Sequence, residues 1–306
     1  MNPIIAAPAT ATPEEFERLV APHRAGLQAH CYRMLGSAAD AEDAVQDAWL
    51  NWSATDRSGV DDPRAYLGKV VANVALTRLR AARRRREVYP GPWLPEPIPT
   101  ADAGDSADAG DSADAVSMAM LVVLETLSPL ERAVFVLHDV FGFGHAEIAA
   151  AVERSEPAVR QAAHRAREHV RARRPRFPAD PARQRAVTER FLAAATGGDV
   201  NALLELLAPD VTVWTDGGGK VRQASRPISG ATTVARWFAA LGTVTYEGFA
   251  PADRTVAVAT LNGAAGLVFR AGGRVLATVT FDLDPDGRIV TIHNVANPDK
   301  LRAVGL

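Results

Sequence analysis

The spacing of apolar residues differs between the two parts of this 306-residue chain, and the difference restricts what the chain can fold into. Up to Arg174, apolar residues recur every three or four positions, which is the period of an α-helix. From Val211 onward, short β-branched stretches alternate with glycine turns, a pattern typical of strands joined by hairpins. The sequence therefore predicts a helical N-terminal part followed by an α+β part.

The helical part begins with three predicted helices. Thr12 and Pro13 form a helix start, so we expect a helix over residues 13–36. Two more helices are predicted over residues 40–53 and 64–86, and Pro63 opens the second of these. We expect the three helices to form one domain, residues 1–88.

Residues 89–115 interrupt the helical pattern. Their second half, DAGDSADAGDSADA, is an acidic tandem repeat that predicts an extended tether, most simply a passive linker. The first half contains Trp93 and Leu94 between prolines, and these two side chains are costly to leave exposed. We expect this half to dock on a folded surface in polyproline-like form.

Residues 116–176 form a second predicted helical domain, which ends in two helices joined by a tight turn. Ser128 and Pro129 cap a helix over residues 130–141, a short helix follows over residues 145–152, and residues 153–155 form the turn. The last helix is basic outside, and such a pair can present a helix to the DNA major groove. The alternative to DNA binding is that the two helices only fill a helical core. The predicted inward residues are Val159, Ala162, Ala163, Ala166 and Val170.

Residues 182–306 are predicted to form the α+β part. Helices are expected over residues 183–196, 200–207 and 229–241. Strands are expected over residues 211–215, 255–261, 266–270, 274–284 and 288–295. Helices that lead into a curved antiparallel sheet predict a cone-shaped domain with an internal pocket.

Composition excludes several classes of protein. The single cysteine, Cys31, rules out an internal disulfide and a cysteine-based zinc site, and we expect neither a metal nor a cofactor. The first 15 residues lack the basic start and apolar run of a signal peptide, and no segment reaches the roughly 18 apolar residues of a membrane span. We therefore expect a soluble, cytoplasmic protein that is monomeric when free and has no membrane partner.

The net charge is only −2, but the positive charge is concentrated in two places. Residues 78–87 hold six arginines and one acid, and residues 155–176 hold seven arginines and two acids. Contacts to phosphates depend on such local patches. We expect the protein alone to bind free duplex DNA weakly, with a larger partner contributing part of the binding affinity.

Several motifs occur in the order found in one family of bacterial proteins. The segments DAEDAVQDAWLNWS, RAYLGKVVANVALTRLRAARRRR and the stretch from Leu127 to Glu168 resemble, in that order, the helices of regions 2 and 4 of extracytoplasmic-function (ECF) sigma factors. The resemblance covers more than half of the chain. It implies that core RNA polymerase and promoter DNA are partners and that the protein directs promoter-specific initiation. Many members have a glycine in the turn of region 4, where this chain has Glu153 and Arg154.

The C-terminal part resembles the SnoaL-like, NTF2-like cone fold, which a minority of these sigma factors carry. Three short sequences mark that subgroup, which includes the SigJ-like factors: WLPEP at residues 93–97, DGGGK at 216–220 and NPDKL at 297–301. The resemblance implies that the extension packs against the sigma domains, with DGGGK near WLPEP, and regulates their spacing or affinity in cis. The expected regulatory residues are Trp93, Leu94, Pro95, Asp216, Gly217, Gly218, Gly219, Lys220, Asn297, Pro298, Asp299 and Lys300.

The resemblance also implies that the helix over residues 40–53 docks on the clamp of RNA polymerase. An acidic helix face would steer docking onto a basic partner, and a tryptophan near the end of the helix could anchor it. A solvated acidic face with a core tryptophan is the alternative. The expected polymerase-binding residues are Asp40, Glu42, Asp43, Asp47 and Trp49.

Recognition of the −10 element requires a surface that traps unstacked bases beside positive charge. The loop over residues 52–63 is the candidate pocket, the helix after it is the candidate wall, and residues 83–86 are expected to hold phosphates. The expected −10 residues are Trp52, Lys69, Asn73, Arg78 and Arg80.

Recognition of the −35 element is expected from the start of the basic helix. Arginine can bond guanine with two hydrogen bonds, and glutamine can pair with adenine. The expected −35 residues are Glu156, Arg160, Gln161, His164 and Arg165.

An alternative function is a small-ligand-binding or enzymatic NTF2-like domain that helical domains deliver to DNA. Trp214, Asp282 and His293 could line its pocket, and an Asp–His pair could perform acid–base chemistry on a polyketide-like or steroid-like substrate. A satisfied strand histidine is the simpler interpretation, so we expect no catalytic residue and no enzyme. A small ligand in the pocket remains a candidate partner.

Overall fold

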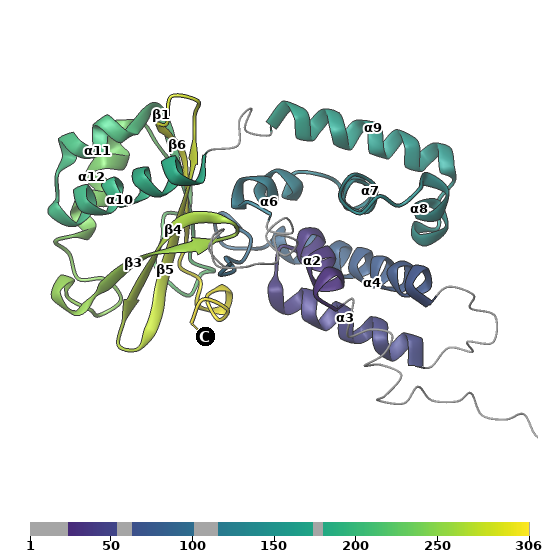
Figure 1. The fold of residues 1–306 in the computed structure, drawn as a ribbon. Helices are drawn as coiled ribbons and strands as arrows, with labels where there is room; N and C mark the ends of the chain where they lie inside the picture. The colour runs from purple at the N-terminus through teal and green to yellow at the C-terminus, as the bar shows by residue number, and fades with distance from the viewer. Residues whose placement is uncertain (1–23, 54–62, 101–115, 174–179, 306) are drawn as a thin grey trace, which may run out of the picture. The chain divides into compact units, whose positions relative to one another are not determined.

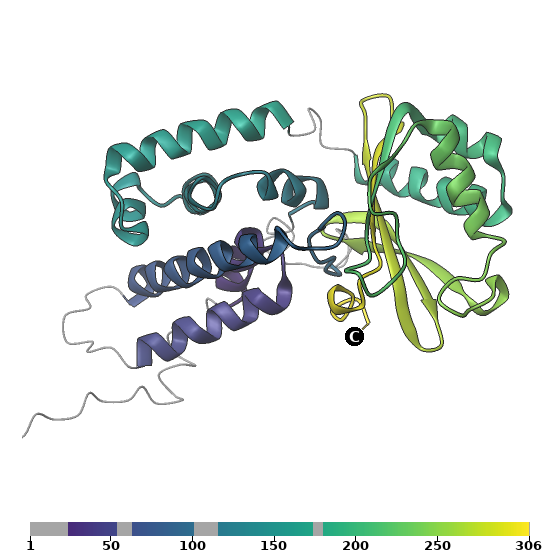
Figure 2. The ribbon, with the colours of Figure 1, turned by 180° about the vertical axis from the view of Figure 1, so that it is seen from behind.

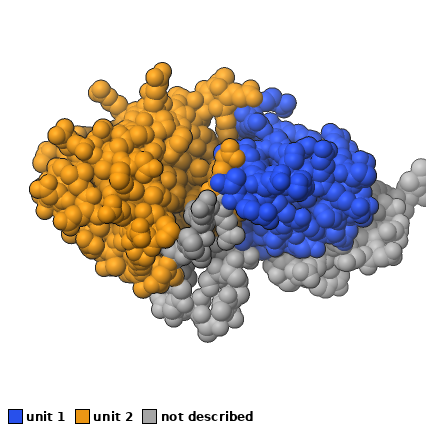
Figure 3. All heavy atoms as spheres, turned by 90° about the horizontal axis from the view of Figure 1, so that it is seen from above, with its two compact units in different colours: residues 1–84, 124–172 blue, residues 85–123, 173–306 orange. Residues whose placement is uncertain are grey.

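The computed structural model describes residues 24–53, 63–100, 116–173 and 180–305. The chain divides into two compact units, which are coloured blue and orange in Figure 3. Unit 1 comprises residues 1–84 and 124–172, and unit 2 comprises residues 85–123 and 173–306. The two helical segments therefore share one unit, whereas the segment around WLPEP groups with the C-terminal sheet.

The helical part follows the predicted period closely. Helices α3 and α4 lie where residues 40–53 and 64–86 predict them, and the described part of the first predicted helix is α2. The acidic repeat and the loop over residues 54–62 lie outside the described residues. The helices are α2 (Arg24–Leu35), α3 (Ala38–Ser53), α4 (Pro63–Arg86), α6 (Met118–Glu125), α7 (Pro129–Phe135), α8 (His145–Val152) and α9 (Glu156–Arg173).

The helix predicted over residues 130–141 is wrong at its end. Its start is as predicted, because Ser128 and Glu131 form a capping box. However, α7 stops at Phe135, and Val136–Val140 form a π-helical turn, η2. The Phe143 amide donates to the Leu137 carbonyl at 3.0 Å, so a hydrogen bond at this end spans six residues instead of four. Apolar spacing does not reveal such a change in hydrogen bonding.

Within unit 1, the two helical segments are joined by a buried arginine. The Arg132 side chain is 1% exposed, and its Nε and Nη2 donate to the main-chain carbonyl of Arg33 at 3.0 and 2.9 Å. Its Nη1 pairs with Glu125. A buried arginine is stable only when its donors are satisfied, so this contact ties α7 to α2.

Unit 2 is built on a six-stranded sheet with the order β2-β1-β6-β5-β4-β3. Strand β1 is parallel to β6, and the other neighbouring strands are antiparallel. The predicted strands and helices are all present. They are α10 (Pro181–Gly197), α11 (Val200–Leu206), β1 (Leu207–Asp216), β2 (Ile228–Ser229), α12 (Ala231–Leu241), β3 (Thr255–Leu261), β4 (Ala264–Ala271), β5 (Arg274–Leu283) and β6 (Ile289–Val295).

Helices α10, α11 and α12 cover one face of this sheet (Figures 1 and 2). Val213, Ile292 and Phe281 lie side by side on β1, β6 and β5 and belong to the core under the helices. Phe191 of α10 packs on Phe281 and on Phe238 of α12, with ring centroids 4.8 Å apart in both pairs. Because successive strand residues alternate between faces, their neighbours point to the opposite face.

Residues 89–100, which we call the strap, dock on that opposite face and on the edge of β3. Leu94 is 1% exposed and packs with Val295 and Leu301. Farther along, the Asn262 amide donates to the Ile98 carbonyl at 2.9 Å, and the Thr100 amide donates to Thr260 at 3.0 Å. The prediction that this segment docks on a folded surface is confirmed.

Candidate functional site

Helix α9 presents the residues predicted to read the −35 element. The five predicted inward residues are all buried, between 0% and 5% exposed. On the outer face, the side chains of Arg160, His164 and Arg165 are 66%, 72% and 52% exposed, and Gln161 is also exposed. The fifth predicted residue, Glu156, accepts from Arg160 at 2.5 Å. The helix thus has a packed face and an exposed polar face.

The turn before α9 has the left-handed conformation that glycine favours. Glu153 caps α8 with φ 53° and ψ 52°, where the resemblance to region 4 leads us to expect a glycine. A side chain with a Cβ atom costs roughly 1–2 kcal/mol in this region. The chain therefore keeps the turn geometry of the motif at an energetic cost.

Two of the outer arginines of α9 also contact residues of α7 and η2. Arg165 donates to Glu131 at 2.8 Å, and Arg167 donates to Asp139 at 2.7 Å. Burial alone would raise the pKa of Glu131, but hydrogen bonds from Ser128 and Arg165 outweigh it and lower the pKa. Arg165 therefore pairs with Glu131 of the same chain while its side chain stays partly exposed on the outer face.

The predicted polymerase-binding and −10 residues meet between α3 and α4. Arg78 of α4 pairs with Asp47 and, at 3.4 Å, with Asp43 of α3. A hollow of about 490 Å³ brings Asp47, Asn73 and Arg78 together. Four residues that were not among the predicted site residues complete its lining: Leu50, which is 57% exposed, Asn51, Val74 and Thr77. The helical pattern identifies inward apolar residues, so it does not predict an exposed leucine at a site.

The other residues of this group lie apart from the hollow, and one of them is buried. Asp40, Glu42 and Trp49 lie on α3 with at least partial exposure, and Lys69 and Arg80 are exposed on α4. Trp52, also an expected −10 residue, is only 1% exposed, so in this structure its side chain lies in the core and not at the surface. Its place in the period of α3 puts its side chain on the inward face of the helix, where burial of its large apolar surface is favourable.

The three subgroup sequences come together in unit 2, in a cluster that we call the latch: Tyr89, Trp93, Leu94, Asp216, Asn297 and Lys300. The Asp216 carboxylate is 0% exposed. It accepts from the Tyr89 hydroxyl at 2.6 Å, the Leu94 amide at 2.8 Å and the Gly218 amide at 3.0 Å. Lys300 also donates to it at 2.6 Å. Every oxygen of this buried charge therefore has partners, as a buried charge requires.

Lys300 closes the latch over the strap. Its Nζ donates to the Leu94 carbonyl at 2.5 Å and lies 3.8 Å from the centre of the Trp93 ring. On the same ring, the Arg86 guanidinium lies 3.4 Å from the centre, so Trp93 contacts two cations. Burial lowers the pKa of Lys300 to about 8, although Asp216 opposes the shift. Burial also raises the pKa of Tyr89, and its bond to Asp216 adds to the rise.

Close backbone approach explains the glycines of DGGGK. Gly218 has φ 61°, and a Cβ atom there would collide with the Asn297 amide group. A Cβ on Gly219, at φ 70°, would lie 2.7 Å from Pro90. Gly218 therefore lets NPDKL approach, and Gly219 lets the strap approach. Around this centre, Pro95 is buried, Pro298 opens a short 3₁₀ turn, and Lys220 pairs with Asp299 at the surface at 2.6 Å.

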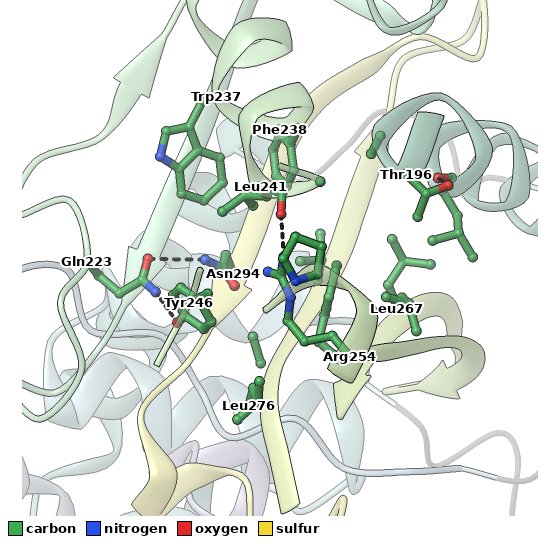
Figure 4. Close-up of a pocket in the computed structure, with 18 residues that line it drawn as sticks. Thr196, Gln223, Trp237, Phe238, Leu241, Tyr246, Arg254, Leu267, Leu276 and Asn294 are labelled. Carbon is green, nitrogen blue, oxygen red and sulfur yellow. Dashed lines mark hydrogen bonds between the residues drawn. The ribbon is translucent and has the colours of Figure 1, made fainter. Parts of the chain in front are cut away.

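A cavity of about 220 Å³ lies between the sheet and the helices of unit 2 (Figure 4). The expectation that Trp214, Asp282 and His293 line it is wrong. His293 does pair with Asp282 at 2.9 Å, but it follows Ile292, which faces the helices, and therefore points to the other face. The polar lining instead comes from Thr196, Gln223, Tyr246, Arg254 and Asn294.

The described residues contain neither a group of metal ligands nor a helix that could span a membrane. Between residues 24 and 305, outside the gaps given above, no three His, Cys, Asp or Glu side chains group as metal ligands. The helices in the same ranges are too short or too polar to cross a bilayer.

Comparison with known proteins covers nearly the whole chain. Models of Sigma-70 region 2 and Sigma-70 region 4 match residues 19–85 and 117–170. The chain is 40% identical over 291 residues to the ECF RNA polymerase sigma factor SigJ of Mycobacterium tuberculosis (strain ATCC 25618 / H37Rv), covering 94% of this chain and 92% of that protein. It is 33% identical over 291 residues to the probable ECF RNA polymerase sigma factor SigI of strain CDC 1551 / Oshkosh, covering 92% and 94%.

The fold is similar over the same length. The crystal structure of SigJ from Mycobacterium tuberculosis matches with a TM-score of 0.70 at 36% identity, covering 95% of this chain and 99% of that one. The order of helical segments and C-terminal sheet is thus shared along both chains. The chain belongs to the extracytoplasmic-function family of RNA polymerase sigma factors.

Proposed function

We propose that this protein binds core RNA polymerase and directs initiation at specific promoters. Helix α9 reads the −35 element, and the surface between α3 and α4 docks on polymerase and contributes to −10 recognition. The observation that carries the proposal is α9 itself, which buries its five inward residues and leaves Arg160, Gln161 and His164 exposed. Exposed arginine and glutamine at the start of a helix suit base edges in the major groove.

The test is run-off transcription with core polymerase on promoter fragments selected by binding of the reconstituted holoenzyme. We expect initiation from a defined start site that depends on the added protein. A core enzyme that is competent with another sigma factor but silent with this protein on every selected fragment would overturn the proposal.

We also propose that unit 2 regulates the sigma segments in cis through the strap. The strap lies in the sequence between the two sigma segments, and the latch anchors it through a buried ion pair. Anchoring shortens the free connection between the two sigma segments. Once one sigma segment is bound, this shorter connection changes the effective concentration of the other segment at its own target. The proposed regulation therefore acts through tether length.

Truncation tests this regulation. The full chain is compared with one that ends near residue 177 and one that ends before Asn297. We expect the three proteins to differ in polymerase affinity and in initiation, because the shorter chains lack the Asn297 and Lys300 contacts. Equal affinity and equal initiation in all three would contradict regulation in cis.

A small-ligand receptor or enzyme carried to DNA is the second candidate function, and the cavity in unit 2 is the observation that favours it. A receptor or enzyme of this kind would bind its ligand without supporting initiation by core polymerase. The run-off assay described above separates the two candidates.

A further inference from the structure

The cavity of unit 2 has apolar walls and a small polar set that is rich in donors. Its volume of about 220 Å³ lies just below the roughly 300–1,000 Å³ of pockets that hold drug-sized ligands. Leu192, Phe238, Leu267 and Phe269 are among the side chains that form its walls. An apolar cavity of this size weakens packing when nothing fills it, so it is costly to keep without a use.

Among the described residues that line the cavity, Arg254 alone carries a charge (Figure 4). Its Nη2 donates to the main-chain carbonyls of Leu241 and Val244 at 2.8 and 2.9 Å, which hold the guanidinium in place. In the described part of the chain, no carboxylate lies within ion-pair distance of it. A positioned guanidinium with remaining N–H groups and apolar surroundings is suited to a carboxylate.

A second donor comes from a short chain of side-chain hydrogen bonds. Asn294 Nδ2 donates to Gln223 Oε1 at 3.3 Å, and Gln223 Nε2 donates to the Tyr246 hydroxyl at 2.7 Å. Because the hydroxyl oxygen already accepts, its proton is available to donate. Burial raises the pKa of Tyr246 to about 12, and Glu247 adds to the rise, so the hydroxyl keeps this proton near neutral pH.

The lining lacks the groups that proton transfer requires. Among the described residues around the cavity there is no Asp, Glu, His, Lys or Cys. General acid–base and nucleophilic catalysis depend on such side chains with pKa values near the working pH. The chemistry of the lining therefore favours binding over turnover.

Two segments connect the cavity with the latch. Asn294 lines the cavity, the next residue on β6, Val295, packs on Leu94 of the strap, and the amide of Asn297 donates to the Asp216 carbonyl at 2.9 Å. Gln223 packs against DGGGK, since a Cβ atom on Gly217 would lie 2.9 Å from its Cγ. A shift of Asn294 therefore reaches the strap through Val295, and a shift of Gln223 reaches it through DGGGK, whose Asp216 accepts from Leu94.

We propose that this cavity binds a small, largely apolar carboxylate, with Arg254 and Tyr246 as donors, and that its occupancy stabilises the latched strap. The carboxylate oxygens accept from the guanidinium and the hydroxyl, and the apolar body lies against the walls. This inference deepens the proposed regulation in cis by naming the class of its effector. Binding itself is independent of polymerase.

Calorimetry on the full chain tests the site with 2-naphthoate, with its uncharged counterpart 2-naphthamide, and with benzoate as a smaller carboxylate. We expect 2-naphthoate to bind at least about tenfold more tightly than 2-naphthamide, as a charge-assisted bond predicts. Arg254→Met should remove this preference, and Tyr246→Phe should weaken 2-naphthoate about fivefold. Arg226→Met is the matched control, because Arg226 is exposed and does not line the cavity.

Three outcomes would overturn the site. They are equal affinity for the acid and the amide, an equal loss in the Arg226→Met control, and no binding of either carboxylate at roughly millimolar concentration. Thermal unfolding of each variant shows whether it folds, and Arg254→Lys, which keeps the charge, should retain part of the preference for 2-naphthoate. Because calorimetry needs no polymerase, failure here is distinguishable from failure of the transcription assay.

Hydrogen exchange at the Leu94 amide, which donates to Asp216, tests the coupling to the strap. If the strap opens only when the cavity is empty, 2-naphthoate at ten times its dissociation constant should slow this exchange about tenfold. Bound 2-naphthoate with unchanged exchange at Leu94 would overturn the coupling.

Discussion

The outer face of α9 and the latch use the same charged residue types in opposite settings. On α9, Arg160 and its partner Glu156 have side chains that are 66% and 40% exposed. In the latch, Lys300 and Asp216 are 8% and 0% exposed. Exposed pairs contribute little to stability and exchange partners readily, whereas a buried pair is costly to break because it leaves a charge without a partner.

This difference matches the two tasks that we propose. A helix that reads DNA must release its protein partners to bind bases and phosphates. A latch must keep one arrangement until a specific event changes it. The predictions below test this contrast from the largest expected effect to the smallest.

Removing the latch carboxylate should have the largest effect. Asp216→Ala leaves Lys300 buried without its charge partner and the Leu94 amide without an acceptor. We expect the free energy of unfolding of unit 2 to fall by about 3–5 kcal/mol, measured by urea denaturation of the full chain.

Asp299→Ala is its control, because Asp299 pairs with Lys220 at the surface. Loss of an exposed pair should cost about 0–1 kcal/mol. Similar costs for the two substitutions would show that burial does not distinguish the latch.

The Arg160 side chain should matter for DNA and not for folding. Arg160→Ala is expected to weaken binding of the polymerase holoenzyme by roughly 1–3 kcal/mol, and only at promoters with the matching base. Competition binding with promoter variants measures this loss. A uniform loss across unrelated promoters would instead identify Arg160 as a phosphate contact.

The stability of unit 2 should rise with pH between about 8 and 10. The pKa of Lys300 is about 8 in the folded protein and 10.5 in its ordinary state, so in this window the unfolded chain holds a proton that the folded chain has released. The free energy of unfolding should therefore increase by roughly 1–2 kcal/mol across the window and level off below it. Denaturation at a series of pH values measures the slope.

Lys300→Met should abolish this rise, since it removes the titrating group. A slope that survives the substitution would assign it to another group. Above about pH 10 the raised pKa of Tyr89 acts in the opposite direction, because the folded protein then keeps a proton that the unfolded chain loses.

The smallest effect is expected in the turn before α9. Glu153→Gly should raise the free energy of unfolding by about 0.5–1 kcal/mol, because glycine adopts the φ of 53° without strain. The greater entropy of the unfolded glycine chain offsets part of this gain. Thermal denaturation measures the shift. A destabilised variant would mean that the Glu153 side chain makes contacts worth more than the strain.

The sequence by itself determined the elements and the inward face of α9. Helical and strand periods depend on which side of a single element faces the core, so Val159, Ala162 and Val170 were identifiable from spacing alone. The subgroup sequences likewise named Asp216, Leu94 and Lys300 as related, although Tyr89, which has no place in those sequences, was missed.

Only the tertiary structure decided how these residues pair. Arg78 meets Asp47, 31 positions away, and Asp216 meets Tyr89, 127 positions away, because helix packing and strand register bring them together. The cavity is a similar case, since Gln223, Tyr246, Arg254 and Asn294 come from four separate segments. Local patterns carry no information about such distances, and the path of the strap likewise follows from the packed fold as a whole.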